Sequence, residues 1–143
     1  KAFSDNFGYV GPLPLIIDST IKENLRYGNT KDISDDKLYE LIKLFDLFNG
    51  EVPDLDLEIN NKSLSSGQMQ KISFIRVMLA DVDILFLDES TSNLDTDTKN
   101  KIYSVLNKLE ITIVNSTHSK EDFEYDFHLN IKNIEGKRSI TIV

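Results

Sequence analysis

The stretch Asp83-Ile84-Leu85-Phe86-Leu87-Asp88-Glu89 decides the fold of this chain. Its run of apolar residues has the length of a strand, and unbroken apolar runs are typical of strands buried on both faces of a parallel sheet. We therefore expect Ile84–Leu87 to be covered on both faces. The acidic pair would then lie at the carboxyl edge of the sheet, where open α/β folds bind their ligands.

Segments on either side of this strand complete an α/β pattern. A helical pattern through Ile102 and Leu109 leads to a second strand at Ile111–Val114, and strand, helix and strand at this spacing form a βαβ unit. Upstream, Phe7–Val10 predicts a short strand, which ends at Gly11-Pro12-Leu13-Pro14 because proline cannot donate to a strand ladder. The sequence thus predicts an α/β fold with a parallel sheet and flanking helices.

Helices are predicted to dominate the region between residues 19 and 80. Thr20-x-x-Glu23 has capping-box spacing and begins a helix of about two turns. Ser34 can cap a second helix, whose apolar periodicity continues to Asn49-Gly50. A third helix is expected over about 67–80, and the polar residues 51–63 are expected to be a loop.

The end of the chain predicts a short helix and a β-hairpin. Ser119-x-x-Asp122 has the spacing of a helix cap. Phe127–Ile131 and Ser139–Val143 have strand composition, and Glu135-Gly136-Lys137 between them is typical of a turn.

Composition limits the classes of function. The chain has 143 residues, which suits one modest domain, and its net charge of −8 disfavours nucleic-acid partners because DNA and RNA are polyanions. It contains no cysteine, which excludes disulfides, thiol catalysis and thiolate metal sites. No apolar run approaches the ~20 residues that cross a bilayer. The chain begins at Lys1 rather than Met, so we expect it to be a piece of a longer protein.

The acidic pair at the strand end is the first candidate for chemistry. Adjacent residues at a strand end point in different directions, so Asp88 and Glu89 can take different tasks. In nucleotide hydrolysis one acid can hold Mg²⁺ while the next positions or deprotonates the attacking water. An ordinary strand end with solvated acids has the same pattern, so the strand alone leaves both interpretations open.

The second candidate is Leu64-Ser65-Ser66-Gly67-Gln68, at the start of the third helix. A helix N-terminus offers unpaired N–H groups and a partial positive charge, and glycine allows close approach, so the segment suits a phosphate. Taken alone, a simple helix cap by Ser65 or Ser66 explains the pattern better.

The order of these features resembles one protein family. Leu64 to Gln68, a helix with Arg76, the strand ending in Asp88-Glu89, then Ser92-Asn93-Leu94-Asp95, and His118 after a further strand are similar to the ATP-binding cassette (ABC) family. The series resembles most closely the nucleotide-binding domain of exporter-type transporters, from about Gly8 to His118. Each motif alone is weak, whereas their combination in this order is specific.

The resemblance implies a role for each motif. Leu64 to Gln68 match the signature motif, which contacts the γ-phosphate of ATP held by the opposite domain of a head-to-tail dimer. Asp88 matches the Walker B aspartate near Mg²⁺, and Glu89 matches the catalytic carboxylate. His118 matches the switch histidine; without the resemblance, a lone histidine at that position would be read as structural.

Two further segments carry implied roles. Asp95 closes the stretch that resembles the D-loop, which communicates across the dimer and contributes to the nucleotide site. Ser19 to Leu25 resemble the exporter segment in the helical subdomain that receives the transmembrane domains. The implied cofactors are ATP and Mg²⁺, and the implied partners are a second nucleotide-binding domain and transmembrane domains, at the cytoplasmic face of a membrane.

The sequence departs from the family pattern at two places. Pro12 stands where the family has its Q-loop glutamine, so any contact of that side chain with Mg²⁺ or water is lost unless another group substitutes. No G-x-x-x-x-G-K-[ST] motif is present, because the one Gly-Lys pair, Gly136-Lys137, lacks the earlier glycine and the following hydroxyl. We therefore expect the chain alone to be inactive.

The resulting prediction is the C-terminal part of one exporter-type nucleotide-binding domain. Residues 1–18 would be a core strand and the Q-loop region, 19–80 the helical subdomain, and 81–143 the second part of the P-loop ATPase core. Two alternatives remain open: a regulatory cassette that binds ATP without hydrolysing it, and a soluble ABC ATPase outside transport. We also expect Ile84–Leu87 to lack one sheet neighbour, and the isolated chain to self-associate.

Overall fold

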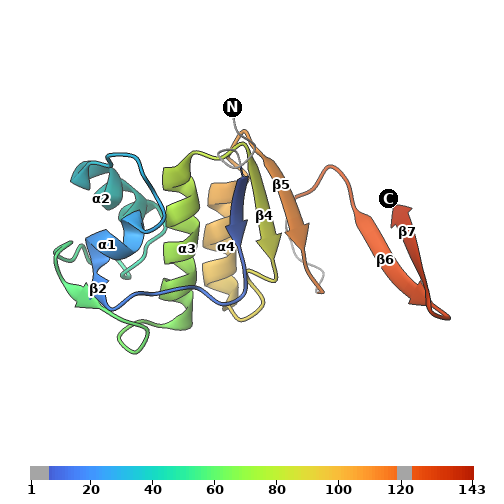
Figure 1. The fold of residues 1–143 in the computed structure, drawn as a ribbon, viewed down its shortest axis with the longest axis horizontal. Coiled ribbons are helices and arrows are strands. Elements are labelled where there is room, and N and C mark those ends of the chain that lie inside the picture. The colour runs from blue at the N-terminus through green and yellow to red at the C-terminus, as the bar shows by residue number, and fades with distance from the viewer. Residues whose placement is uncertain (1–6, 119–123) are drawn as a thin grey trace.

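The computed structural model describes residues 7–118 and 124–143 (Figure 1). Strand β4 (Ile84–Asp88) is the middle strand of a three-stranded parallel sheet, between β1 (Phe7–Val10) and β5 (Thr112–Ser116). The predicted α/β fold with a parallel sheet and flanking helices is confirmed. The expectation that Ile84–Leu87 would lack a sheet neighbour is wrong, because β4 is hydrogen-bonded along both edges.

One face of the sheet is buried and the other is exposed. Leu85 and Leu87 are each 1% exposed on the face that packs against the helices. Phe86 points the opposite way and is 39% exposed. The expected burial of Ile84–Leu87 on both faces is therefore wrong, since no element of the described chain covers the Phe86 side.

Helix α3 (Ser66–Ala80) lies against the buried face, beside α4 (Thr96–Leu106) (Figure 1). Gly8 in β1 allows this approach, because a Cβ at that position would lie 2.8 Å from Cγ1 of Val77 on α3. The α4 helix connects β4 to its parallel neighbour β5, so the predicted βαβ unit is confirmed.

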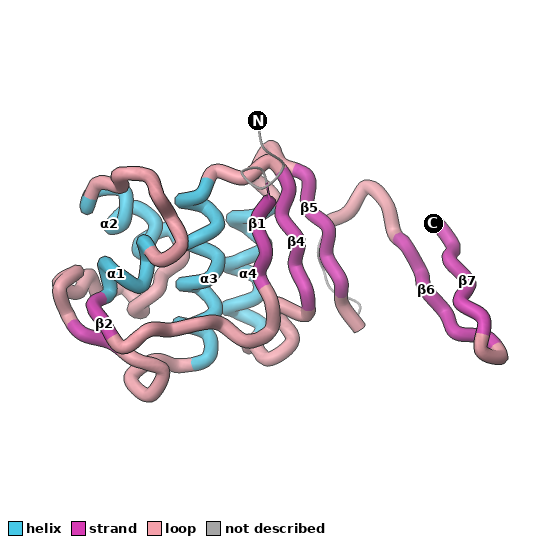
Figure 2. Tube along the Cα trace, in the orientation of Figure 1, coloured by secondary structure: helices cyan, strands magenta, loops and turns pink. Residues whose placement is uncertain are grey.

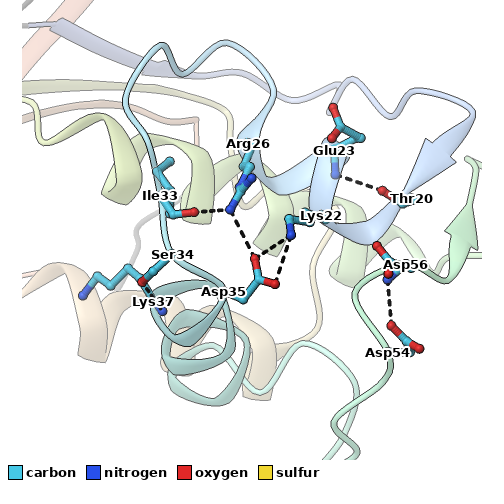
Figure 3. Close-up of polar contacts among 10 residues, drawn as sticks. All are labelled: Thr20, Lys22, Glu23, Arg26, Ile33, Ser34, Asp35, Lys37, Asp54 and Asp56. Carbon is cyan, nitrogen blue, oxygen red and sulfur yellow. Dashed lines mark hydrogen bonds and ion pairs between the residues drawn. The ribbon is translucent and has the colours of Figure 1, made fainter.

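Helix α1 (Ile21–Arg26) packs on the side of α3 that faces away from the sheet, and α2 (Asp35–Leu44) packs against α1 (Figure 1). The caps predicted for them form, since Thr20 accepts from the N–H of Glu23 and Ser34 from that of Lys37 (Figure 3). The α2 helix is shorter than predicted. Its apolar pattern continues through tight turns with a positive φ at Asp46, and these turns keep Phe45 and Leu47 fully buried without a helix.

A charged cluster fastens α1 to the start of α2 (Figure 3). The carboxylate of Asp35 lies 2.7 Å from Nζ of Lys22 and 3.2 Å from Nη2 of Arg26. Arg26 also donates to the backbone carbonyl of Ile33. The cluster therefore ties α1 to the first residue of α2, Asp35, and to the end of the intervening loop at Ile33.

Residues 51–63 contain one element that the sequence did not predict. Strand β3 (Glu58–Ile59) pairs antiparallel with β2 (Ser19–Thr20) immediately before α1. Each strand has two residues, too few for a periodic pattern, and the expected loop otherwise describes the segment.

Strands β6 (Leu129–Ile134) and β7 (Lys137–Ile142) form the predicted antiparallel hairpin. Glu135 and Gly136 both have positive φ values, as a two-residue turn that matches the strand twist requires. The hairpin stands apart from the three-stranded sheet (Figures 1 and 2). The short helix expected at Ser119-x-x-Asp122 lies outside the described residues.

Candidate active site

The two carboxylates at the end of β4 contact different side chains. Oδ2 of Asp88 accepts a hydrogen bond from the Tyr9 hydroxyl at 3.1 Å. Oε1 of Glu89 lies 3.3 Å from Nε2 of His118. The carboxyl edge of the sheet thus brings Asp88, Glu89 and His118 into one site.

The backbone of Glu89 is held in an uncommon conformation. Its φ is +50°, a backbone conformation that residues other than glycine seldom adopt and that costs about 1–3 kcal/mol. The N–H of Glu89 donates to the carbonyl of Ser116 at 2.9 Å, and its carbonyl accepts from the N–H and the hydroxyl of Ser92. These bonds fix the direction in which the Glu89 side chain leaves the sheet.

The Glu89–His118 pair is open to solvent on its histidine side. The His118 side chain is 97% exposed, whereas that of Glu89 is 26% exposed. Exposed pairs of this kind contribute only about 0–1 kcal/mol to stability. The pair therefore supplies a carboxylate and an imidazole that are both accessible to a reactant.

Tyr9 reaches the site from the neighbouring strand. The hydrogen bond to Asp88 raises the pKa of the Tyr9 phenol, with further contributions from burial and from the Asp88 charge. The phenol therefore acts as a hydrogen-bond donor to Asp88 at neutral pH. Sequence reasoning missed this residue, because the contact joins two strands that are far apart along the chain.

The segment predicted to bind phosphate forms a capping box at the start of α3. Ser65 Oγ accepts from the N–H of Gln68 at 3.1 Å, and Oε1 of Gln68 accepts from the N–H of Ser65 at 2.8 Å. The helix-cap interpretation of Ser65 is therefore realised. Helix geometry leaves the N–H groups of Ser66 and Gly67 without intrahelical acceptors, so these two remain the donors available to an anion.

Asp95 is engaged within its own helix. It caps α4 by accepting from the N–H of Thr98 at 2.9 Å and from the Thr98 hydroxyl at 2.8 Å. These hydrogen bonds, the backbone one foremost, lower the pKa of Asp95. Thr98 also faces Gly67, where an added Cβ would lie 3.6 Å from its Oγ1, so the start of α4, which Asp95 caps, lies beside the start of α3.

The donor set at the sheet edge fits Mg²⁺ bound with a nucleotide. Among residues 7–118 and 124–143, no three His, Cys, Asp or Glu side chains gather into a self-sufficient metal site. Mg²⁺ in nucleotide sites uses one or two carboxylates, with substrate phosphates and water completing its shell. Asp88 supplies one such carboxylate at the accessible edge, and Glu89 follows it directly.

Two polar side chains on α3, the buried Gln70 and the half-buried Arg76, hold the loop that follows β1; sequence reasoning did not identify Gln70. Gln70 is 2% exposed and donates to the carbonyl of Gly11 at 3.0 Å. Arg76 donates to the carbonyls of Asn24 and Leu15. The sequence signal that could have identified Gln70 is a polar residue on the buried face of a helix, since a buried polar group needs a hydrogen-bond partner.

A groove of about 550 Å³ opens between this loop and α3. Residues of β1 and the loop form one wall, and Tyr27 and Arg76 form part of the other. The Arg76 guanidinium lies 5.2 Å from the centre of the Tyr27 ring, a cation–π distance.

No helix within the described ranges is long and apolar enough to span a membrane.

Comparisons with known proteins identify relatives of this chain. The chain is 31% identical to the ATP-dependent permease MDL1 of Candida albicans, over 94% of this chain and 21% of that protein. It is 34% identical to the ATP-dependent lipid A-core flippase 2 of Colwellia psychrerythraea, over 72% of this chain and 18% of that protein. The chain thus spans about a fifth of these relatives.

A solved structure and a family model match as well. The structure of a bacterial Atm1-family ABC exporter with ATP bound superposes with a TM-score of 0.67 at 26% identity, covering 77% of this chain and 21% of that one. The family model described as ABC transporter matches residues 1–92. The chain therefore belongs to the ABC transporter family.

Proposed function

We propose that this chain is the C-terminal part of an exporter-type nucleotide-binding domain, in a protein that couples ATP binding and hydrolysis to transport across a membrane. The observation that carries the proposal is the 3.3 Å contact between Glu89 and His118, with Asp88 beside them at the carboxyl edge of the sheet. The relatives named as a permease and a flippase support a transport role.

Glu89 is the candidate for the group that acts on the attacking water. An ionised carboxylate accepts hydrogen bonds only, so it can orient a water molecule and take its proton. The fixed backbone of Glu89 keeps this acceptor in place. Base catalysis of this kind contributes about 10²- to 10⁴-fold in rate. His118 can donate to Glu89, or to the γ-phosphate when ATP is present.

Asp88 is the side chain that would hold Mg²⁺, which neutralises charge on the phosphates when it is bound. The N–H groups of Ser66 and Gly67, with Leu64, Ser65 and Gln68 shaping that helix start, would meet the phosphate of ATP held by a second domain. Asp95 would act from the neighbouring helix start. ATP would then lie between two domains, one presenting its sheet edge and the other its α3 start.

The proposed domain has three parts. We assign residues 1–18 to the core strand and Q-loop region, residues 19–80 to the helical subdomain with the signature motif, and residues 81–143 to the second part of the ATPase core. Transmembrane domains would contact the helical subdomain, which places the domain at the cytoplasmic face of the membrane.

The test is Glu89→Gln in the full-length protein. We expect turnover to fall by about 10²- to 10⁴-fold, while ATP stays bound and a stable dimer accumulates, as seen by size-exclusion chromatography with radiolabelled ATP. Glu110→Gln, which changes an exposed acid ahead of β5, serves as the matched control and keeps wild-type turnover. Equal turnover of wild type and Glu89→Gln would remove Glu89 from the mechanism.

A regulatory cassette that binds ATP without hydrolysis is a second candidate, favoured by one observation. Pro12 is exposed at the Q-loop position and has no side-chain donor or acceptor. Single-turnover measurements of each ATP site in the assembled protein separate the two candidates.

A soluble ABC ATPase outside transport is a third alternative, and membrane-spanning segments encoded in the same full-length protein would exclude it. The isolated 143-residue chain, lacking the phosphate loop, is expected to show no magnesium-dependent turnover.

A further inference from the structure

The loop after β1 cannot supply a polar side chain to the site at Pro12. Proline has neither a donor nor an acceptor in its side chain, and Pro12 itself is exposed. The backbone carbonyl of the adjacent Gly11 is already engaged by Gln70 at 3.0 Å. If this edge of the site has a polar group from β1 or its loop, that group must come from another residue.

Tyr9 is placed to be that group. It pairs in register with Phe86, and side chains alternate along a strand, so Tyr9 lies on the same sheet face as Phe86 and Asp88. The length of the phenol bridges the diagonal step to Asp88, and its hydroxyl lies 3.1 Å from Oδ2. Tyr9 is thus the residue of β1 that contacts the candidate metal carboxylate.

Gly11 makes room for this contact. A Cβ at Gly11 would lie 2.8 Å from the Tyr9 hydroxyl oxygen and 3.0 Å from Cε1 of the same ring. Since Gln70 holds the Gly11 backbone, the loop could not easily retreat from such a clash. The absence of a side chain at Gly11 therefore permits the orientation in which the phenol reaches Asp88.

We propose that Tyr9 is a positioning residue that aims the Asp88 carboxylate at the Mg²⁺ of the bound nucleotide, in place of a polar side chain at Pro12. This inference rests on the proposed function. A carboxylate offers about four acceptor positions, so a hydrogen bond to Oδ2 leaves Oδ1 available to the cation. The 3.1 Å distance is long for an O–H···O hydrogen bond, which suits a contact that orients Asp88 without competing with the metal.

The first test is Tyr9→Phe in the full-length protein, which removes the hydroxyl and keeps the ring. Mn²⁺ binding is measured by electron paramagnetic resonance with a non-hydrolysable ATP analogue, and turnover is measured against Mg²⁺ concentration. We expect the apparent dissociation constant for Mn²⁺ to rise about 3- to 10-fold, as loss of one hydrogen bond predicts. Maximal turnover at saturating Mg²⁺ should stay within about twofold of wild type for a residue that acts through Asp88.

Tyr125→Phe is the matched control, because Tyr125 is exposed to about the same extent as Tyr9 and lies next to the hairpin. It should leave both readouts unchanged. A Tyr9→Phe protein that binds Mn²⁺ as wild type does would overturn the assignment of Tyr9 and leave the proposed function standing. A wild-type protein without nucleotide-dependent Mn²⁺ binding and without turnover would overturn both.

Gly11→Ala provides a second, independent variant. The added methyl group should displace the phenol and weaken Mn²⁺ binding to a similar extent. Because both changes remove the same contact, their effects in the double variant should be smaller than the product of the single effects. Fully multiplicative effects would show that Gly11 acts on the site by another route.

Discussion

Nε2 of His118 lies 3.3 Å from Oε1 of Glu89, so the first residue after β4 and a residue just beyond β5 meet at one edge of the sheet. The hydrogen bond from the N–H of Glu89 to the carbonyl of Ser116 holds the two chain segments together beneath this contact. The backbone thus sets the position of both side chains, while the imidazole remains open to solvent.

The first prediction concerns His118. His118→Ala in the full-length protein should lower turnover by about 10²-fold, because Glu89 loses its neighbour and the γ-phosphate loses a donor. ATP affinity should change far less, which separates chemistry from binding. Steady-state ATPase assays with equilibrium ATP binding check this. His128→Ala changes the other histidine, which lies beside the hairpin, and should keep wild-type turnover; equal losses in the two variants would contradict the role of His118.

Local sequence signals predicted most of the elements. The caps at Thr20, Ser34 and Ser65 depend on residues three positions apart, so they could be predicted without knowledge of the fold. The end of α2 could not, because Phe45 and Leu47 bury their side chains from turns and so imitate the helical pattern.

Contacts between distant segments explain what the sequence did not predict at the site. Tyr9 meets Asp88 only because β1 pairs with β4, and Gln70 meets Gly11 only because α3 packs on β1. Burial of Phe86 was predicted wrongly for a related reason. A continuous apolar run shows that a strand can be covered on both faces, but whether it is covered depends on what other parts of the molecule supply.

The second prediction concerns the packing of α3 on β1. Gly8→Ala should destabilise the complete nucleotide-binding domain by about 1–3 kcal/mol. The new methyl group would overlap Cγ1 of Val77, and the β-branched valine side chain is too stiff to rotate away. Urea unfolding measures the change. Val77→Ala in the Gly8→Ala background should restore part of the loss, with a coupling of about 1 kcal/mol. Additive losses would show that the two residues do not compete for the same space.

The third prediction concerns acid stability at Asp95. Hydrogen bonds from Thr98 lower the pKa of Asp95 in the folded state. The carboxylate therefore contributes stability that is fully present above its unfolded pKa of about 3.9 and is lost as the pH falls through the folded value. Asp95→Asn keeps a capping side chain but does not titrate, so its melting temperature should approach that of wild type below about pH 4.

Thermal unfolding of the complete domain between pH 7 and pH 3 checks this dependence. Thr98→Val keeps the backbone donor and removes the hydroxyl donor, so it should show an intermediate dependence on pH. A difference between wild type and Asp95→Asn that stays constant down to pH 3 would rule out this contribution.

The fourth prediction concerns the uncovered face of the sheet. Phe7, Phe86 and Val114 are partly exposed on neighbouring strands of this face, and β5 pairs only with β4 among the described residues. Exposed apolar sheet surface next to an open strand edge favours association with other chains. The isolated 143-residue chain should therefore self-associate at micromolar concentrations, as sedimentation velocity would show.

Phe86→Thr should shift the distribution toward monomer because it removes apolar surface and keeps strand propensity. Leu13→Thr makes a similar change at an exposed position of the loop after β1, outside the strands of the sheet, and should leave the distribution unchanged. If the wild-type chain sediments as a single monomeric species, the Phe86 face does not drive association.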